Sequence, residues 1–114
     1  MREDGKLDYV EFRGGDMPAI QRFYRQAFGW TFTDYGPSYA AFSEGLDGGF
    51  DTDPDIEEIK PPLAILYARD LEAMEARVKT AGGRIVEPIY AFPGGRRFHF
   101  ADPAGNELAI WSEG

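Results

Sequence analysis

The chain of 114 residues contains no cysteine, which excludes a disulfide scaffold, a thiol nucleophile and thiolate metal sites. It contains a single histidine, His99, which excludes a site that needs two imidazoles. The chain has few basic residues: its 12 lysines and arginines and 20 aspartates and glutamates give a net charge of −8. We therefore expect no nucleic-acid partner, and favour a neutral or cationic small molecule. The chain has no apolar run of membrane-spanning length and no signal-peptide pattern, so we expect a cytoplasmic protein with no membrane partner.

Two segments have the pattern of an amphipathic helix with matching ends. The first follows Asp16 and stops at Gly29, and the second follows Asp70 and stops at residues 82–83, which are both glycine. A strand pattern precedes each helix, at residues 7–13 and 63–69. A shift of 54 residues aligns the strands, the two aspartates, and Gly29 with Gly83. The chain is therefore expected to contain two copies of one unit.

Short strand patterns after each helix complete two β-α-β-β-β modules, at about residues 6–51 and 63–112. An acidic, proline-bounded segment at residues 51–62 joins the modules and is expected to be exposed. We expect one domain over residues 1–114, of the α+β class, with a curled mixed sheet around a cleft and the helices outside. The strands expected after the helices are 30–33, 38–43 and 48–51 in the first module, and 84–88, 97–101 and 107–111 in the second.

Alternation along the strands predicts which side chains line the cleft. Val10 and Phe12 share an apolar face suited to packing under a helix, and the intervening residues point the other way. The same alternation separates Phe98 from the polar residues on either side of it. The predicted ligand-binding residues on the cleft face are Tyr9, Glu11, Arg13, Ile65, Tyr67, Arg97, His99, Ala109 and Trp111.

Three motifs carry a resemblance to a known family: residues 9–12 (YVEF), 23–30 (FYRQAFGW) and 100–108 (FADPAGNEL). They resemble the vicinal-oxygen-chelate superfamily of lactoylglutathione lyases, extradiol dioxygenases, fosfomycin-resistance transferases and bleomycin-resistance proteins. The resemblance is closest to small proteins related to lactoylglutathione lyase. It implies paired β-α-β-β-β modules that curl around a cleft, and a homodimer.

The metal-dependent members of this superfamily hold a divalent ion on the first and last strands of each module. Carried over by the resemblance, these positions fall on Tyr9, on Leu63, on Ala109 and near Asp51. Leucine and alanine have no donor atom, and a neutral tyrosine binds divalent ions weakly. We therefore expect no metal and no other cofactor.

Two residues on the cleft face, Glu11 and His99, each have two interpretations. Glu11 is a candidate general base if it is buried without a partner, or a structural carboxylate held by Arg13, by Arg97 or by a tyrosine hydroxyl. His99 contacts the ligand or acts as an acid–base partner of Glu11, which is the only carboxylate that we expect beside it, or it is structural.

These residues support two functional hypotheses. The first is a metal-independent protein of the glyoxalase/bleomycin-resistance type that binds a drug or metabolite, planar or cationic, between Glu11 and His99 and against Tyr67 and Trp111. The alternative is a lyase, isomerase or dioxygenase-like enzyme whose rebuilt catalytic site uses Glu11 and His99. Whether the chain is an enzyme stays open at this point.

Overall fold

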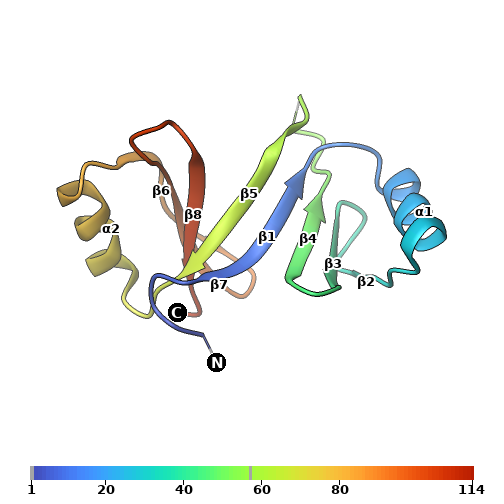
Figure 1. The fold of residues 1–114 in the computed structure, drawn as a ribbon, viewed down its shortest axis with the longest axis horizontal. Coiled ribbons are helices and arrows are strands. Elements are labelled where there is room, and N and C mark those ends of the chain that lie inside the picture. Colours follow the sequence, from blue (N-terminus) through green and yellow to red (C-terminus); the bar gives the residue numbers. More distant parts are fainter. Residues whose placement is uncertain (1, 57) are drawn as a thin grey trace. The chain divides into compact units, whose positions relative to one another are not determined.

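The computed structural model describes residues 2–56 and 58–114, which form two compact units of α+β structure (Figure 1). We call residues 9–63 the first unit, and residues 2–8 with 64–114 the second unit. The α+β class and the repeated β-α-β-β-β order agree with the sequence prediction, whereas the cleft stays a prediction. In chain order the elements are β1 (Leu7–Arg13), α1 (Met17–Phe28), β2 (Thr33–Asp34), β3 (Tyr39–Ser43), β4 (Asp47–Asp51), β5 (Lys60–Tyr67), α2 (Leu71–Thr80), β6 (Arg84–Phe92), β7 (Gly95–Ala101) and β8 (Glu107–Ser112).

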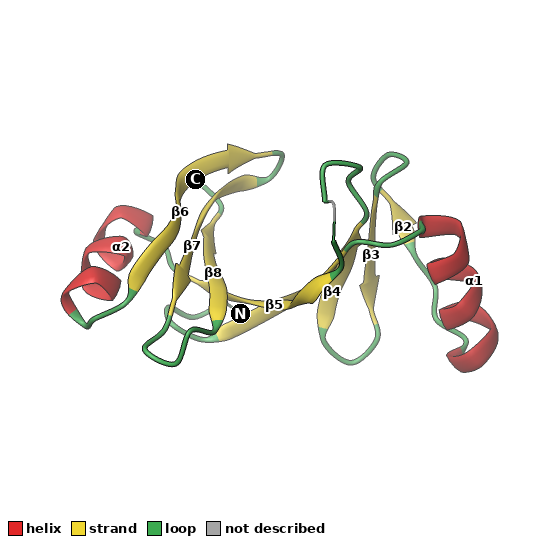
Figure 2. Cartoon of the chain, turned by 90° about the horizontal axis from the view of Figure 1, so that it is seen from above, coloured by secondary structure: helices red, strands yellow, loops and turns green. Residues whose placement is uncertain are grey.

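In the first unit the strand order is β2-β3-β4-β1, and α1 lies on one face of these strands (Figure 2). Strand β4 runs antiparallel to β3 and parallel to β1, which places Gly49 opposite Glu11. Val10 and Phe12 pack into the core under the helix, as the alternation predicts, so Glu11 lies on the other face. The core consists of Met17, Ala40, Phe42 and Phe50, with Val10, Phe12, Ile20, Tyr24, Trp30 and Phe32 packed against it.

In the second unit the strand order is β5-β8-β7-β6, and α2 covers one face (Figure 2). Strand β5 runs parallel to β8, while β8, β7 and β6 are antiparallel. Phe98 lies in the core under α2, and its strand neighbours Arg97 and His99 are on the opposite face. The core consists of Ala68, Leu71, Phe98 and Ile110, with Leu66, Met74, Val78, Ile85, Ile89 and Phe100 packed against it.

The two helices start alike and end differently. Asp16 and Asp70 precede them, as predicted, and both have an extended backbone. Gly29 ends α1 in the left-handed conformation, with φ 74°. Just after α2 the glycine with a positive φ is Gly82, at 103°. The predicted alignment of Gly29 with Gly83 is therefore wrong by one residue, because α2 is shorter than α1.

Three strands begin or end three or more residues away from the predicted limit. Strand β2 contains only Thr33 and Asp34, and Trp30 and Phe32, which were predicted to be in it or at its start, precede it and pack against the core of the first unit. Strand β6 continues past Pro88 to Phe92, and an edge strand with register shifts tolerates the missing amide donor. Residues 60–62, placed in the linker by the prediction, begin β5, although they are exposed as predicted. Neither helix of the described chain is long and apolar enough to span a membrane.

The two helix starts provide a matched test of capping. The Asp70 carboxylate accepts a hydrogen bond from the amide of Ala73 at 3.0 Å, whereas the side chain of Asp16 makes no capping bond. We expect Asp70→Ala to lower the free energy of unfolding by about 1 kcal/mol, and Asp16→Ala to lower it much less. Urea unfolding of both variants measures the difference. Equal losses of unfolding free energy in the two variants would show that the hydrogen bond from Ala73 to Asp70 adds no stability.

Candidate functional site

The first unit carries a hydrogen-bonded group on the sheet face opposite α1, which we call the tyrosine–carboxylate cluster: Tyr9, Glu11 and Tyr39. The Tyr39 hydroxyl donates to Glu11 Oε2 at 3.0 Å, and the hydroxyls of Tyr9 and Tyr39 are 2.7 Å apart. Since Tyr39 has one proton and gives it to the carboxylate, Tyr9 is the donor to Tyr39. Glu11 is 3% exposed. Among the partners that were expected for a structural Glu11, the structure shows a tyrosine hydroxyl, that of Tyr39.

The environment of Tyr39 keeps its hydroxyl protonated. Burial raises the pKa of Tyr39, and the negative charge of Glu11, to which the Tyr39 hydroxyl donates, raises it further. A neutral Tyr39 can act as a donor to the Glu11 carboxylate over a wide pH range. The neighbouring Arg13 guanidinium donates to the Pro61 carbonyl, at 2.8 Å from Nη2 and 3.2 Å from Nε.

The strand registers identify the fourth of the family's metal-ligand positions. Ala109 lies opposite Ile65 in the pair β5–β8, and the 54-residue shift aligns Ile65 with Glu11. The residue opposite Glu11 is Gly49, so Gly49 is the counterpart of Ala109. Gly49 lies two residues before Asp51, near which the resemblance placed this position.

The residues at these positions do not fit a divalent ion. Leu63, Ala109 and Gly49 provide no donor side chain. A Cβ atom on Gly49 would overlap the Tyr39 hydroxyl and lie 2.7 Å from the Tyr9 hydroxyl, so the tyrosines already occupy the space over this position. Among the described residues, no three His, Asp or Glu side chains lie close enough to hold a metal.

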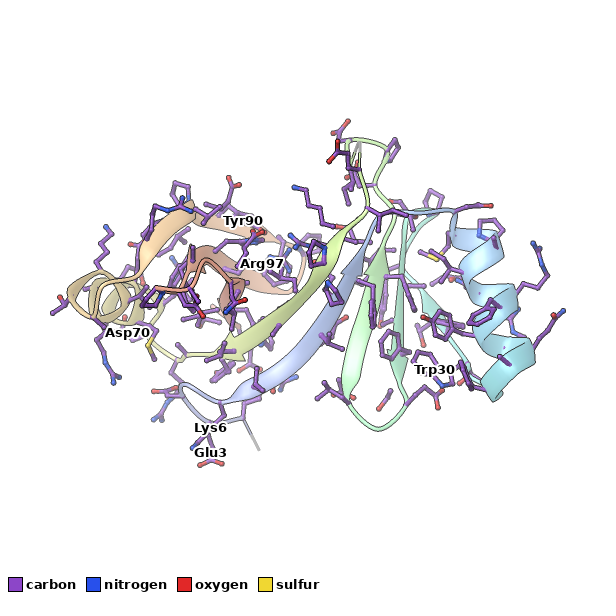
Figure 3. The ribbon with its side chains drawn as sticks, turned by 45° about the horizontal axis from the view of Figure 1, so that its top comes forward. Glu3, Lys6, Trp30, Asp70, Tyr90 and Arg97 are labelled. Atoms are coloured by element: carbon purple, nitrogen blue, oxygen red, sulfur yellow. The ribbon has the colours of Figure 1, made fainter. Side chains whose placement is uncertain are left out.

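The second unit carries a row of flat side chains across its four strands, which we call the planar row: Tyr67, Trp111, Arg97 and Tyr90. Tyr67 is paired with Trp111, Trp111 with Arg97, and Arg97 with Tyr90. The rings of Tyr67 and Trp111 meet edge to face at 5.5 Å. The Arg97 guanidinium lies 5.6 Å from the centre of the Tyr90 ring and 5.6 Å from that of Phe92. Figure 3 shows Tyr90 and Arg97 close together on β6 and β7.

His99 lies beside the planar row and has hydrogen-bond partners on both ring nitrogens. Nδ1 is 2.9 Å from Glu107 Oε2, and Nε2 is 2.8 Å from the Tyr90 hydroxyl. Because a carboxylate only accepts, Nδ1–H donates to Glu107, and Arg97 Nε donates to the same Tyr90 hydroxyl. Glu11 was expected to be the only carboxylate near His99. That expectation is wrong, because the β7–β8 pairing places Glu107 there.

The predicted site residues therefore fall into two groups. Tyr9 and Glu11 meet in the first unit, while Arg97, His99, Tyr67 and Trp111 lie in the second. Ile65 and Ala109 are opposite each other and buried. A ligand between Glu11 and His99, and a catalytic role for either, stay predictions. The site residues that sequence reasoning missed are Tyr39, Tyr90 and Glu107. The period-two pattern of the last predicted strand was the one signal that could have pointed to Glu107 beside His99.

A family model and two curated proteins match this chain over nearly all of its length. Residues 6–110 match the model of the Glyoxalase/Bleomycin resistance protein/Dioxygenase superfamily. The anthracycline biosynthesis protein DnrV of Streptomyces peucetius is 32% identical over an alignment of 133 positions, covering 96% of this chain and 48% of DnrV. The chain thus spans about half the length of the curated relatives it matches.

Solved structures support the same fold. A Legionella pneumophila chain described as an NAD-dependent benzaldehyde dehydrogenase has a TM-score of 0.75 at 17% identity, covering 93% of this chain and 98% of that one. The methylmalonyl-CoA epimerase of Mycobacterium tuberculosis has a TM-score of 0.73 at 14% identity, covering 100% of this chain and 91% of the epimerase. At these identities the likeness concerns the fold alone. With the family model matching nearly the whole chain, the protein belongs to the glyoxalase/bleomycin resistance protein/dioxygenase superfamily.

Proposed function

We propose that this protein binds a planar small molecule, a drug or a metabolite, and that it does so without a metal ion. The observation that carries the proposal is the planar row, in which two phenols, an indole and a guanidinium face the same side of four neighbouring strands. Flat groups of this kind stack on aromatic ligands with little loss of side-chain freedom. Trp111 is at the centre of this argument, because its indole is half-buried and therefore partly accessible.

Two further observations support the proposal. The residues at the family's metal-ligand positions do not fit a divalent ion, and the tyrosine–carboxylate cluster occupies the space over Gly49. DnrV and DauV are both described as anthracycline biosynthesis proteins, and anthracyclines are planar polycyclic molecules. A planar polycyclic ligand is therefore the class that we infer for this chain.

Tryptophan fluorescence tests the proposal, because the chain has only two tryptophans, Trp30 and Trp111. Trp30 packs against the core of the first unit and lies beside α1 (Figure 3). In a Trp30→Phe variant the remaining emission comes from Trp111, and we expect 1,4-dihydroxyanthraquinone, a neutral planar probe, to quench it saturably.

The matched control is Trp111→Phe, which retains only Trp30. We expect no saturable quenching in this variant. Equal quenching in the two variants, or none in either, would contradict binding on the planar row.

A further inference from the structure

The indole of Trp111 already has a planar cation stacked on it. The Arg2 guanidinium carbon lies 5.0 Å from the centre of the Trp111 ring. Arg2 Nε is 3.2 Å from Asp8 Oδ2, and Nη1 is 3.9 Å from Glu113 Oε2. Asp8 Oδ2 also accepts a hydrogen bond from Trp111 Nε1 at 2.9 Å. An aromatic face bordered by two carboxylates is a combination that recognises flat cations.

The two carboxylates are fixed by contacts other than those with Arg2. Asp8 is held by the indole nitrogen of Trp111. Glu113 Oε1 accepts a hydrogen bond from the Tyr67 hydroxyl at 2.8 Å, and this bond is the main reason that the pKa of Tyr67 is raised. Tyr67 therefore stays a donor to Glu113, so removal of Arg2 leaves both carboxylates with a partner that orients them.

Three hydrogen bonds attach the segment that leads to Arg2 to Tyr67 and Arg69. The amide of Gly5 donates to the Tyr67 carbonyl at 2.8 Å, and the amide of Tyr67 donates to the Lys6 carbonyl at 3.2 Å. The Asp4 carboxylate accepts from the amide of Arg69 at 2.9 Å. Figure 3 labels Glu3 and Lys6 in this segment. Because the attachments begin at Asp4, the Arg2 side chain can leave Trp111 without disturbing them.

We propose that Trp111, Asp8 and Glu113 form a binding site for a planar organic cation, and that Arg2 is an internal occupant that such a ligand displaces. This inference rests on the proposed function and specifies its ligand class: an aromatic ring system that carries a protonated amine, amidine or guanidinium. The ligand's rings replace the guanidinium on the indole, and its positive charge replaces that of Arg2 between the two carboxylates. The net charge of −8 favours the approach of such a cation.

The contacts of Arg2 are of the weak kind that a ligand can displace. Its side chain is 46% exposed, and exposed ion pairs and cation–π contacts each contribute little. A polycyclic cation covers more of the indole than a guanidinium does and forms the same pairing with Asp8. Arg2 is therefore expected to reduce the affinity of the site for its ligand without abolishing binding.

The test uses proflavine, a planar tricyclic cation, and measures its dissociation constant by its own fluorescence. We expect Arg2→Ala to tighten proflavine binding about fivefold, because the ligand no longer competes with a stacked cation. The matched control is Arg22→Ala, which removes the same charge from an exposed position on α1. We expect this control to change the affinity much less.

A second pair of variants tests the requirement for positive charge. Asp8→Asn is expected to weaken proflavine binding about fivefold and to leave 1,4-dihydroxyanthraquinone binding nearly unchanged, since that probe is neutral. Equal effects of Arg2→Ala and Arg22→Ala, or an equal loss of both probes in Asp8→Asn, would overturn the cation site while leaving the proposed function intact. Failure of both probes to bind the unmodified protein would overturn the proposed function as well.

Discussion

Replacement of Gly49 by alanine is expected to lower the free energy of unfolding by about 2 kcal/mol, the size typical of overpacking a filled site. An added Cβ atom would overlap the Tyr39 hydroxyl and lie 2.7 Å from the ring carbon Cζ of Tyr39 and 2.7 Å from the Tyr9 hydroxyl. Tyr39 cannot move aside without losing its hydrogen bond to the buried Glu11. Urea unfolding of the variant measures the loss.

A double-mutant cycle with Tyr39→Ala identifies the cause of that loss. If the tyrosine fills the space over Gly49, the cost of Gly49→Ala should fall by about 1 kcal/mol in the Tyr39→Ala background. Gly48→Ala is the control, because a Cβ atom there would overlap the backbone carbonyl of Val10 and lie 2.6 Å from the Phe42 ring. Its cost should not depend on Tyr39. Strictly additive losses for Gly49→Ala and Tyr39→Ala would mean that the tyrosine does not occupy this space.

Alkaline pH is expected to destabilise the protein through Tyr39. The hydroxyl ionises near pH 10 in the unfolded chain, whereas burial and the charge of Glu11 raise its pKa in the folded state. The stability that Tyr39 contributes through this pKa difference is fully present below pH 10. Above pH 10 the unfolded state releases a proton that the folded state keeps, so the free energy of unfolding falls by about 1.4 kcal/mol per pH unit from this group.

The comparison of wild type with Tyr39→Phe isolates this contribution. The variant should be less stable near neutral pH, because Glu11 loses a hydrogen-bond donor, but its stability should fall less steeply above pH 10. Tyr35→Phe is the control, since Tyr35 is 66% exposed. Urea unfolding at pH 8, 10 and 11 provides the slopes. Parallel pH profiles for wild type and Tyr39→Phe would show that Tyr39 does not hold a raised pKa.

Sequence alone predicts much of the fold because its signals are local. The alternation in residues 7–13 places Val10 and Phe12 under the helix and Glu11 on the other face, and the structure agrees. The aspartate before each helix likewise marks both helix starts. The sequence does not specify where the second helix ends, because glycines at positions 82 and 83 offer two equivalent stops. The left-handed conformation of Gly82 resolves which one is used.

The candidate site depends on strand register, which the sequence does not specify. Tyr39 reaches Glu11 because β3, β4 and β1 are paired in a particular register, and a tyrosine in a strand otherwise indicates only packing. Tyr90 reaches His99 because β6 continues beyond Pro88 with shifted pairing, where proline suggested a strand end. Glu107 was not predicted beside His99 because the register of β7 and β8 was unknown. Arg2 lies outside every periodic segment, so no sequence pattern indicated its contact with Trp111.

The most direct test of the central claim combines elemental analysis with a binding titration. Protein purified without chelators or added metal should contain far less than one divalent ion per chain, because Leu63, Ala109 and Gly49 offer no donor side chain. After dialysis against EDTA, calorimetric titration with 1,4-dihydroxyanthraquinone should give the same dissociation constant as before dialysis. A near-equimolar metal that is lost in Glu11→Ala or His99→Ala, together with loss of probe binding after EDTA, would contradict metal-independent recognition of a planar ligand.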